Sequence, residues 1–369
     1  MSYSTQQIRN VALAGHPGAG KTTLFEALLH AGGALQVAGT IERGTTVSDH
    51  DPLEKSRGHS IDTAIASTDH GGMHVNLIDT PGYPEFRGPA LSALSAVETA
   101  LIVVDADQGV AHGTRRLMER AAQRHLCRAI VINKIDHEGA DCAAVLAALR
   151  EEFGPEVLPL NLPADGGKAV IDCFRQSTGV SDLGDVADWH QKIIDQVVEI
   201  NETVMEHYLD LGEGGLSGQE LHDAFEQCLR EGHLVPVCFV SARTGAGVRE
   251  LLDILGKLAP DPTEANMPAF LKGEGAAAEP VEVVLDAERH VVAHVFQIAN
   301  DPYRGKLGLF RVHQGQVTPN SQLYIGDGRK PFKVGHLFML QGAKNVEIDR
   351  AFPGDIAAVA KVDEIEFDC

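Results

Sequence analysis

The chain has 369 residues, enough for two or three domains that each bury a core of their own. Apolar residues make up 44% of the sequence and charged residues 22%, which excludes wholesale disorder. The formal net charge is −21, so nonspecific wrapping of a nucleic-acid backbone is disfavoured and we expect no sequence-specific binding of DNA.

The cysteine pattern and the lack of long apolar runs favour a cytoplasmic location. Six cysteines occur without a C-x-x-C pair, so the sequence suggests neither a zinc site nor a disulfide framework, and a reducing cytoplasmic setting fits best. No long apolar run is present, so we expect neither export nor a membrane partner.

Residues up to about 150 alternate short apolar runs with amphipathic helical stretches, which is typical of βαβ units in a mainly parallel sheet. The expected strands are Val11–Ala14, Val75–Ile78, Leu101–Val104 and Ala129–Ile132. Polar motifs follow these runs at the expected carboxyl edge of the sheet, where open α/β sheets bind ligands.

The segment after the first expected strand matches the phosphate-binding pattern G-x-x-x-x-G-K-[ST]. Lys21 is expected to contact the β- and γ-phosphates, and the Thr22 hydroxyl is expected to bind Mg²⁺. The predicted phosphate-binding residues are Gly15, His16, Pro17, Gly18, Ala19, Gly20, Lys21, Thr22 and Thr23. This pattern alone does not separate ATP from GTP.

Two further segments fit the phosphate end of such a site. Asp79-Thr80-Pro81-Gly82 follows the second expected strand, and it fits a segment whose Asp reaches Mg²⁺ through water while the Gly N–H senses the γ-phosphate. The region from Gly44 to Ile61 is rich in Thr, Ser and Asp and has little hydrophobic periodicity. It is either a segment ordered by bound γ-phosphate and magnesium or a plain surface loop.

Asn133-Lys134-Ile135-Asp136 closes a buried strand and selects the base, because the Asp136 carboxylate can accept both the ring N–H and the exocyclic amine of guanine. Ser241-Ala242 follows another apolar run and fits the loop that braces the guanine ring. The predicted base-binding residues are Asn133, Lys134, Asp136, Ser241, Ala242 and Arg243. We therefore predict GTP or GDP with Mg²⁺ as ligands.

The 104 residues between Asp136 and Ser241 exceed what one crossover helix needs, so we expect an inserted subdomain at about 156–235. Apolar residues at helical spacing predict one long amphipathic helix there. They are Ile193, Ile194, Val197, Val198, Val204, Met205, Tyr208 and Leu209. A second helix is expected to start at the capping box Ser217-Gly218-Gln219-Glu220.

Residues 259–288 are rich in Pro, Ala, Gly and Glu, including Gly273–Pro280, which indicates a linker. The strand-like runs beyond it predict a small β-barrel at 289–369. They are Val291–Ile298, Leu307–Val312, Gln322–Ile325, Lys333–Phe338 and Asp355–Val362. The predicted fold is thus an α/β P-loop GTPase domain at 1–258, with helices on both faces of its sheet and an inserted α/β subdomain, followed by the linker and the barrel.

Taken together, these motifs resemble those of the translational GTPases, and the similarity to elongation factor G runs along essentially the whole chain. Arg57-Gly58-His59-Ser60-Ile61 stands where that family has Arg-Gly-Ile-Thr-Ile, and Asp79–Tyr83 stands where it has Asp-Thr-Pro-Gly-His. Asp301–Lys306 and Ala351–Ile356 look like parts of the family's second domain.

Three residues depart from the family pattern. Gly18 replaces an Asp of the phosphate loop, Ser60 replaces a threonine that binds magnesium, and Tyr83 replaces the histidine that orients the attacking water. These changes are similar to those in elongation factor G-like paralogues. The resemblance implies metal ligands Thr22, Ser60 and Asp79, and catalytic residues Tyr83, Lys21 and Gly82, although a phenol with a pKa of about 10 is a poor base at neutral pH.

The resemblance further implies a cytoplasmic monomer that acts on the ribosome and hydrolyses GTP slowly by itself. Two alternatives stay open: a nucleotide-gated binding or regulatory module with little hydrolysis, and a GTPase of ribosome assembly, rescue or protection. The chain ends at Cys369, near the expected close of the second domain, so we expect it to be part of a longer protein, with a naturally short form as the alternative.

Overall fold

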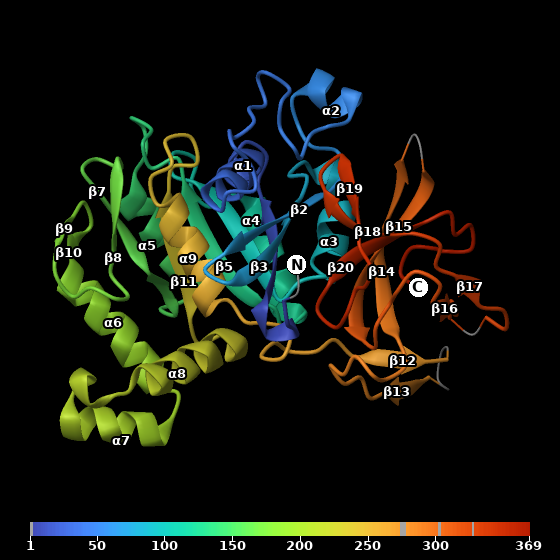
Figure 1. Cartoon of the computed structure of the whole chain (residues 1–369). Helices are drawn as coiled ribbons and strands as arrows, with labels where there is room; N and C mark the ends of the chain where they lie inside the picture. The colour runs from blue at the N-terminus through green and yellow to red at the C-terminus, as the bar shows by residue number, and fades with distance from the viewer. Residues whose placement is uncertain (1–2, 274–277, 302–303, 327) are drawn as a thin grey trace.

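A seven-stranded sheet forms the centre of the first part of the chain (Figure 1). The computed structural model describes residues 3–273, 278–301, 304–326 and 328–369. The strands are β1 (Ile8–Gly15), β2 (Ala64–His70), β3 (Met73–Asp79), β4 (Thr99–Asp105), β5 (Cys127–Asn133), β6 (Val157–Pro159) and β11 (Val235–Val240). Their order is β2-β3-β1-β4-β5-β11-β6, and only the β2–β3 pair is antiparallel. Each of the four predicted strands lies inside an observed one, so the mainly parallel sheet is confirmed.

Helices cover both faces of this sheet because its strands are apolar on both sides. In β1, Val11 and Leu13 join one buried cluster, while Ala12 and Ala14 join the other. The first cluster includes residues of α1 (Lys21–Ala31) and α9 (Val248–Leu258). The second includes residues of α3 (Arg87–Ala93), α4 (His112–Gln123) and α5 (Cys142–Phe153). The short helix η1 (Thr5–Gln7) precedes β1, and α2 (Pro52–Arg57) and η2 (Pro84–Phe86) lie in connections between elements. Among the described residues, no helix has the length and apolar character needed to cross a bilayer.

The residues between β6 and β11 build structure of their own at the far side of the sheet from the second part (Figure 1). They form β7 (Asn161–Ala164), β8 (Ala169–Asp172), β9 (Val180–Ser181), β10 (Gly184–Asp185), α6 (Val186–Val198), α7 (Glu202–Leu211), η3 (Glu213–Gly215) and α8 (Gly218–Glu231). Helix α8 begins at the predicted capping box, where the Ser217 side chain accepts from Glu220 N at 3.1 Å.

The prediction of one long helix in this region is wrong, because α6 and α7 are separate. Asn201 has extended backbone angles, and its side chain accepts from Thr203 N at 2.9 Å and Val204 N at 3.3 Å. This is an N-cap, which satisfies amide groups that a continuous helix would have bonded to the preceding turn. Leu209 is 74% exposed and so falls outside the packed stripe.

The second part of the chain is β-rich (Figure 1, orange to red). Its five-stranded antiparallel sheet has the order β14-β15-β20-β18-β19, and β16 and β17 form a separate pair. The strands are β14 (Val292–Asp301), β15 (Gly305–Gln314), β16 (Gln322–Leu323), β17 (Phe332–Lys333), β18 (Leu337–Gln341), β19 (Lys344–Glu347) and β20 (Ile356–Ala360). The segment predicted as a linker contains a pair of short strands, β12 (Phe270–Lys272) and β13 (Glu279–Val281). The linker residues 274–277 and the motif residues Pro302 and Tyr303 lie outside the described residues.

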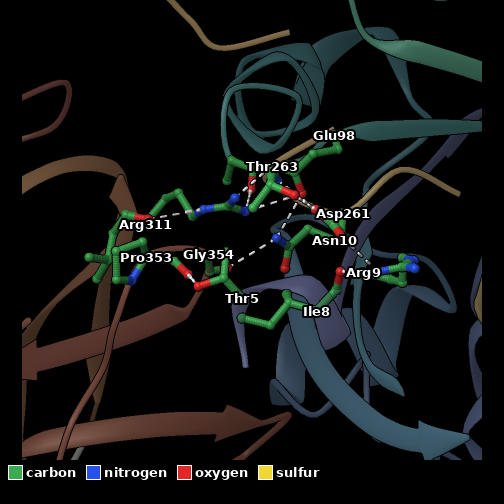
Figure 2. A network of polar contacts seen from close by, with 12 residues as sticks. Thr5, Ile8, Arg9, Asn10, Glu98, Asp261, Thr263, Arg311, Pro353 and Gly354 are labelled. Carbon is green, nitrogen blue, oxygen red and sulfur yellow. Dashed lines mark hydrogen bonds and ion pairs between the residues drawn. The ribbon is translucent and has the colours of Figure 1, made fainter. Parts of the chain in front are cut away.

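A buried ion pair joins the two parts of the chain (Figure 2). Arg311 on β15 places Nη2 2.6 Å from Oε1 of Glu98, which precedes β4, and donates from Nη1 to Ala96 O at 3.0 Å. From the other side, Asn10 on β1 donates to Glu98 Oε2 at 2.8 Å and to Gly354 O at 3.1 Å. The second part is therefore bonded to the strand that leads into the phosphate loop.

Candidate functional site

The predicted phosphate loop connects β1 to α1, as the sequence pattern requires. Lys21 opens the helix, and its Nζ donates to Gly15 O at 3.0 Å and His16 O at 3.1 Å. The side chain is buried, and burial lowers the pKa of Lys21, against the opposing charges of Asp79 and Asp49. A buried ammonium bonded to two carbonyl oxygens is suited to receive an anionic phosphate oxygen.

Glycine is required in this loop for backbone and packing reasons. Gly20 has φ +87°, and a Cβ there would lie 2.5 Å from Nδ2 of Asn133. Gly18 has φ +79°, and a Cβ would meet no described atom within 4 Å. Lack of space therefore does not explain why Gly18 replaces the Asp that the resemblance implies. Thr23 follows in α1 and is half-buried.

The three predicted metal ligands converge at one corner beside the loop. Thr22 Oγ1 donates to Asp79 Oδ2 at 2.7 Å and lies 3.2 Å from Ser60 Oγ. Ser48 Oγ also donates to Asp79 Oδ2, at 2.6 Å. All four side chains are buried, and burial raises the pKa of Asp79 to about 6, against the hydrogen bonds from Ser48 and Thr22.

The chemistry of this corner fits Mg²⁺. Two buried carboxylate oxygens, Asp79 Oδ1 and Asp49 Oδ2, have no hydrogen-bond partner within the described part of the chain. Mg²⁺ prefers oxygen ligands and is usually held by one or two carboxylates together with water and substrate phosphates. Sequence reasoning missed Ser48 and Asp49, and the only signal for them was the polar character of the region from Gly44 to Ile61.

Asn133 links the three segments predicted for the base end of the site. Its Nδ2 donates to Ala19 O in the phosphate loop at 2.9 Å. Its Oδ1 accepts from Lys134 N at 2.8 Å and from Ala242 N at 3.0 Å. Residues 114 and 109 positions apart are thereby bonded to one buried amide side chain. Lys134 has φ +68°, and its Nζ donates to Asp105 Oδ2 at 2.6 Å.

The Asp136 carboxylate is held between two donors. Ser241 Oγ donates to Oδ1 at 2.6 Å, and Arg243 Nη2 donates to Oδ2 at 2.7 Å. Burial acts to raise the pKa of Asp136, but the hydrogen bonds from Ser241 and Arg243 outweigh it, and the pKa is lowered. An ionised, oriented carboxylate is what recognition of two neighbouring N–H donors requires.

Of the predicted catalytic residues, Lys21 and Gly82 lie at the phosphate loop, whereas the Tyr83 side chain points partly to solvent. Gly82 lies against the loop, because a Cβ there would come within 2.5 Å of Lys21 Nζ and 2.9 Å of Pro17 N. The Tyr83 side chain is 40% exposed, and its ring packs on the His59 ring at a centroid distance of 4.5 Å. In the described residues the Tyr83 hydroxyl makes no hydrogen bond, so the phenol is not bonded to the phosphate loop.

A cavity of about 420 Å³ opens beside the phosphate loop. Its lining includes His16 and Pro17 of the loop, Gly82, and two arginines, Arg87 of α3 and Arg116 of α4. Loop, glycine and cationic side chains therefore surround one hollow at the carboxyl edge of the sheet.

Comparison with known proteins agrees with this geometry. A family model described as the elongation factor Tu GTP binding domain matches residues 6–261, and one described as elongation factor G domain 2 matches residues 290–366. The chain belongs to the elongation factor Tu GTP-binding domain family. The two matches, in this order along the chain, confirm the resemblance to translational GTPases of the elongation factor G type that the motifs indicated.

Several known proteins are similar to this chain along most of its length. An elongation factor G-like protein of Mycobacterium tuberculosis strain H37Rv is 31% identical over 390 residues, covering 97% of this chain and 54% of the relative. Elongation factor G of Thermotoga neapolitana is 28% identical over 371 residues, covering 95% and 53%. A solved crystal structure of a protein from Thermus thermophilus matches with a TM-score of 0.83 and 32% identity, covering 98% of this chain and 54% of that one. The chain thus spans about half the length of the relatives it matches.

Proposed function

We propose that this chain binds GTP or GDP with Mg²⁺ at the carboxyl edge of its sheet, hydrolyses GTP slowly by itself, and acts on the ribosome as an elongation factor G-like protein. The observation that carries the proposal is the Asn133 side chain, which bonds the phosphate loop and the Ser241-Ala242 loop to the strand end that presents Asp136. One pocket can then bind the phosphates and recognise the base of the same nucleotide.

The phosphate end has a separate role for each residue. Lys21 would exchange its carbonyl partners for β- and γ-phosphate oxygens, and the Gly82 N–H would face the γ-phosphate. Thr22, Ser60 and Asp79 would hold the cation. Bound Mg²⁺ supplies positive charge that offsets the charge developing on the phosphates during transfer.

At the base end, Asp136 would accept hydrogen bonds from guanine, while Ser241 and Arg243 keep its carboxylate oriented. Calorimetric titration with GDP, GTP and ATP in the presence of Mg²⁺ tests this assignment. We expect uptake of both guanine nucleotides and little of ATP, because adenine lacks the paired donors.

An Asp136→Asn variant sharpens the test. It should weaken GTP binding and favour xanthine nucleotide, because the amide donates where the carboxylate accepted. Unchanged guanine selectivity in a competition assay would refute the base assignment, and absence of any nucleotide uptake by the native chain would refute the proposed function as a whole.

Hydrolysis and ribosome action require a different measurement. Single-turnover GTP hydrolysis should be slow for the chain alone and faster with ribosomes, because the partly exposed Tyr83 does not complete the site. Hydrolysis that ribosomes do not stimulate would contradict the ribosome part of the proposal.

Tyr83 also favours a second candidate, a nucleotide-gated binding module with little hydrolysis. A phenol is protonated at neutral pH and is a weak acceptor of a proton from water. Under this alternative a Tyr83→His change leaves partner binding untouched, whereas under the first proposal it changes a measurable hydrolysis rate.

A further inference from the structure

The carboxylate of Glu26 is buried on α1 and is bonded to the segment between α1 and α2. The residue is 1% exposed, its Oε2 accepts from Gly39 N at 2.9 Å, and its Oε1 accepts from Val47 N at 2.6 Å. Burying a carboxylate costs free energy unless hydrogen-bond donors satisfy it. Because both described donors are backbone amides of this segment, the carboxylate holds the segment against the helix.

Val47 immediately precedes two buried residues at the predicted metal site, Ser48 and Asp49. Ser48 Oγ donates to Asp79 Oδ2 at 2.6 Å. The charge of Asp49 acts on Asp79, and Asp49 Oδ2 has no hydrogen-bond partner within the described residues. The bond that fixes Val47 N therefore fixes the point from which Ser48 and Asp49 reach the metal site.

The second part of the chain also contacts Val47, through the turn between β18 and β19 (Figure 1). A Cβ at Gly342 in this turn would overlap Val47 Cγ1 and the Val47 carbonyl oxygen. Gly342 N donates to Ile65 O on β2 at 2.8 Å, and Gln341 Nε2 donates to Ser67 O on the same strand at 2.8 Å. The sheet thus fixes the turn, and Val47 contacts both α1 and the turn.

We propose that Glu26 is a positioning residue for the bound cation, and this rests on the proposed function above. By fixing Val47 beside the turn at Gly342, Glu26 presents Ser48 and Asp49 to the predicted metal site. The Asp49 carboxylate then adds a second carboxylate to the site, and Mg²⁺ is usually held by one or two together with water and phosphate oxygens. Glu26 itself acts only through the backbone that it holds.

A purely structural role for Glu26 predicts a different result. Loss of a loop anchor would then lower the free energy of unfolding, but the molecules that stay folded would keep the native affinity for Mg²⁺. A positioning role lowers that affinity in the folded molecules themselves. The Mg²⁺ dependence of nucleotide binding therefore separates the two roles.

The test replaces Glu26 by Gln, which keeps the shape but offers one acceptor oxygen where the carboxylate has two. The Nε2 of the new amide then faces one backbone N–H of the segment, and one of the two bonds is lost. Binding of a fluorescent, non-hydrolysable GTP analogue is measured over a range of Mg²⁺ concentrations and in EDTA. We expect the Mg²⁺ concentration at half-maximal binding to rise about tenfold, as for the loss of one hydrogen bond to a charged group, and the affinity in EDTA to stay within about twofold of native.

Hydrogen exchange gives a second measurement that needs neither nucleotide nor metal. The amides of Gly39 and Val47 are the donors to Glu26. We expect at least one of them to exchange faster in Glu26→Gln than in the native chain, because its acceptor is gone. Equal exchange of both amides would show that Glu26 does not hold the segment, and would overturn the inference.

Asp172→Asn is the matched control. Asp172 Oδ1 also accepts from two backbone amides, Phe174 N at 3.0 Å and Arg175 N at 2.9 Å, but it lies in the inserted subdomain. We expect the Mg²⁺ dependence of Asp172→Asn to match that of the native chain.

A second pair of variants tests the contact from the side of the turn, and it applies even if Glu26→Gln does not fold. Gly342 has φ +59° and Gly305 has φ +75°, so alanine strains the backbone at both positions. A Cβ at Gly342 would overlap Val47, whereas a Cβ at Gly305 meets no described atom within 4 Å. Gly342→Ala should therefore raise the half-maximal Mg²⁺ concentration about fivefold, and Gly305→Ala should leave it unchanged.

The inference is overturned if folded Glu26→Gln has a half-maximal Mg²⁺ concentration within about twofold of native, or if Gly342→Ala and Gly305→Ala behave alike. It is also overturned if the affinity in EDTA falls as much as the affinity with Mg²⁺, because the effect would then not act through the cation. If the native chain binds no guanine nucleotide at all, the proposed function fails first, so the two failures are distinguishable.

Discussion

Replacing Arg311 by Met should destabilise the junction between the two parts of the chain strongly. The Arg311 and Glu98 side chains are 2% and 10% exposed, and the change leaves the Glu98 carboxylate buried with Asn10 Nδ2 as its remaining described donor. Removing one partner of a buried ion pair costs about 3–5 kcal/mol, because the other charge stays uncompensated. Since Asn10 keeps one hydrogen bond to that carboxylate, we expect the lower end, about 3 kcal/mol.

Urea unfolding followed by circular dichroism measures this loss. The fluorescence of Trp189, which lies on α6, should report the same midpoint if the chain unfolds in one transition. Adding Glu98→Gln to Arg311→Met removes the orphaned charge. The double variant should therefore recover at least about 1 kcal/mol relative to Arg311→Met alone.

A surface ion pair of the same length is the control. Arg115 Nε lies 2.6 Å from Glu152 Oε1, but these side chains are 43% and 34% exposed. Arg115→Met should shift the urea midpoint far less than Arg311→Met does, because water solvates the charge that remains. The reasoning is refuted if Arg311→Met and Arg115→Met shift the urea midpoint equally. It is also refuted if the losses in unfolding free energy caused by Arg311→Met and Glu98→Gln are additive in the double variant.

Three further predictions concern single residues. Burial lowers the pKa of His313 to about 2, with the charge of Arg311 adding to it, so the folded chain holds this ring neutral while the unfolded chain protonates it below about pH 6.5. The contribution of the neutral His313 ring to the free energy of unfolding is therefore fully present above about pH 6.5. It is lost as the pH falls toward the folded-state pKa, and the loss is about 2 kcal/mol at pH 5. Urea titrations should show that His313→Phe removes this loss, whereas replacing the exposed His233 does not. Gly82→Ala should slow single-turnover hydrolysis and weaken GTP more than GDP in calorimetry, since the new methyl would crowd the Lys21 ammonium. Asn133→Ala should weaken GDP and GTP alike by about tenfold or more in the same assay, because it unlinks both loops from the strand, and a selective effect on GTP would contradict that account.

The nucleotide motifs could be predicted from the sequence because each is local. A glycine loop followed by Lys21, or a strand followed by Asn133 and Asp136, carries its chemistry within a few residues of known spacing. The parallel sheet then brings the strand ends to one edge, so the convergence of distant motifs follows from the strand pattern. The structure confirms the sheet on which that prediction depends.

The break between α6 and α7 could not be read from hydrophobic periodicity. Val204 stands eleven residues after Ile193, which is about three helical turns, so the apolar stripe stays in phase across the interruption. The decisive signal was the N-cap residue Asn201, which satisfies the first amide groups of the new helix. Hydrophobic periodicity indicates which side of a helix is buried, whereas capping residues indicate where a helix begins and ends.

Distant contacts of residues that belong to no motif could not be predicted from the sequence. Ser48 meets Asp79 31 positions away, and Arg311 meets Glu98 213 positions away. No spacing rule links such pairs, because the path between them runs through the packing of whole elements. For the segment from Gly44 to Ile61 the sequence left two interpretations open, a segment ordered by γ-phosphate and magnesium or a plain surface loop. The structure buries its Ser48 hydroxyl against Asp79, a position that no pattern in the sequence indicated.

The two carboxylates of the candidate site are prepared in opposite ways, and this difference indicates what each one binds. Burial raises the pKa of Asp79 to about 6 against the hydrogen bonds that Ser48 and Thr22 donate to Oδ2, and Oδ1 has no described partner, so a cation bound at Oδ1 would stabilise the ionised form further. Asp136 has a lowered pKa and two donors of its own, so it is an acceptor before any ligand is present. Under the proposed function, guanine would be recognised by a preformed group, whereas the phosphate end would be completed only when cation and nucleotide enter together. Binding at that end can then depend on the number of phosphates, which is the distinction a GTP-dependent switch must make.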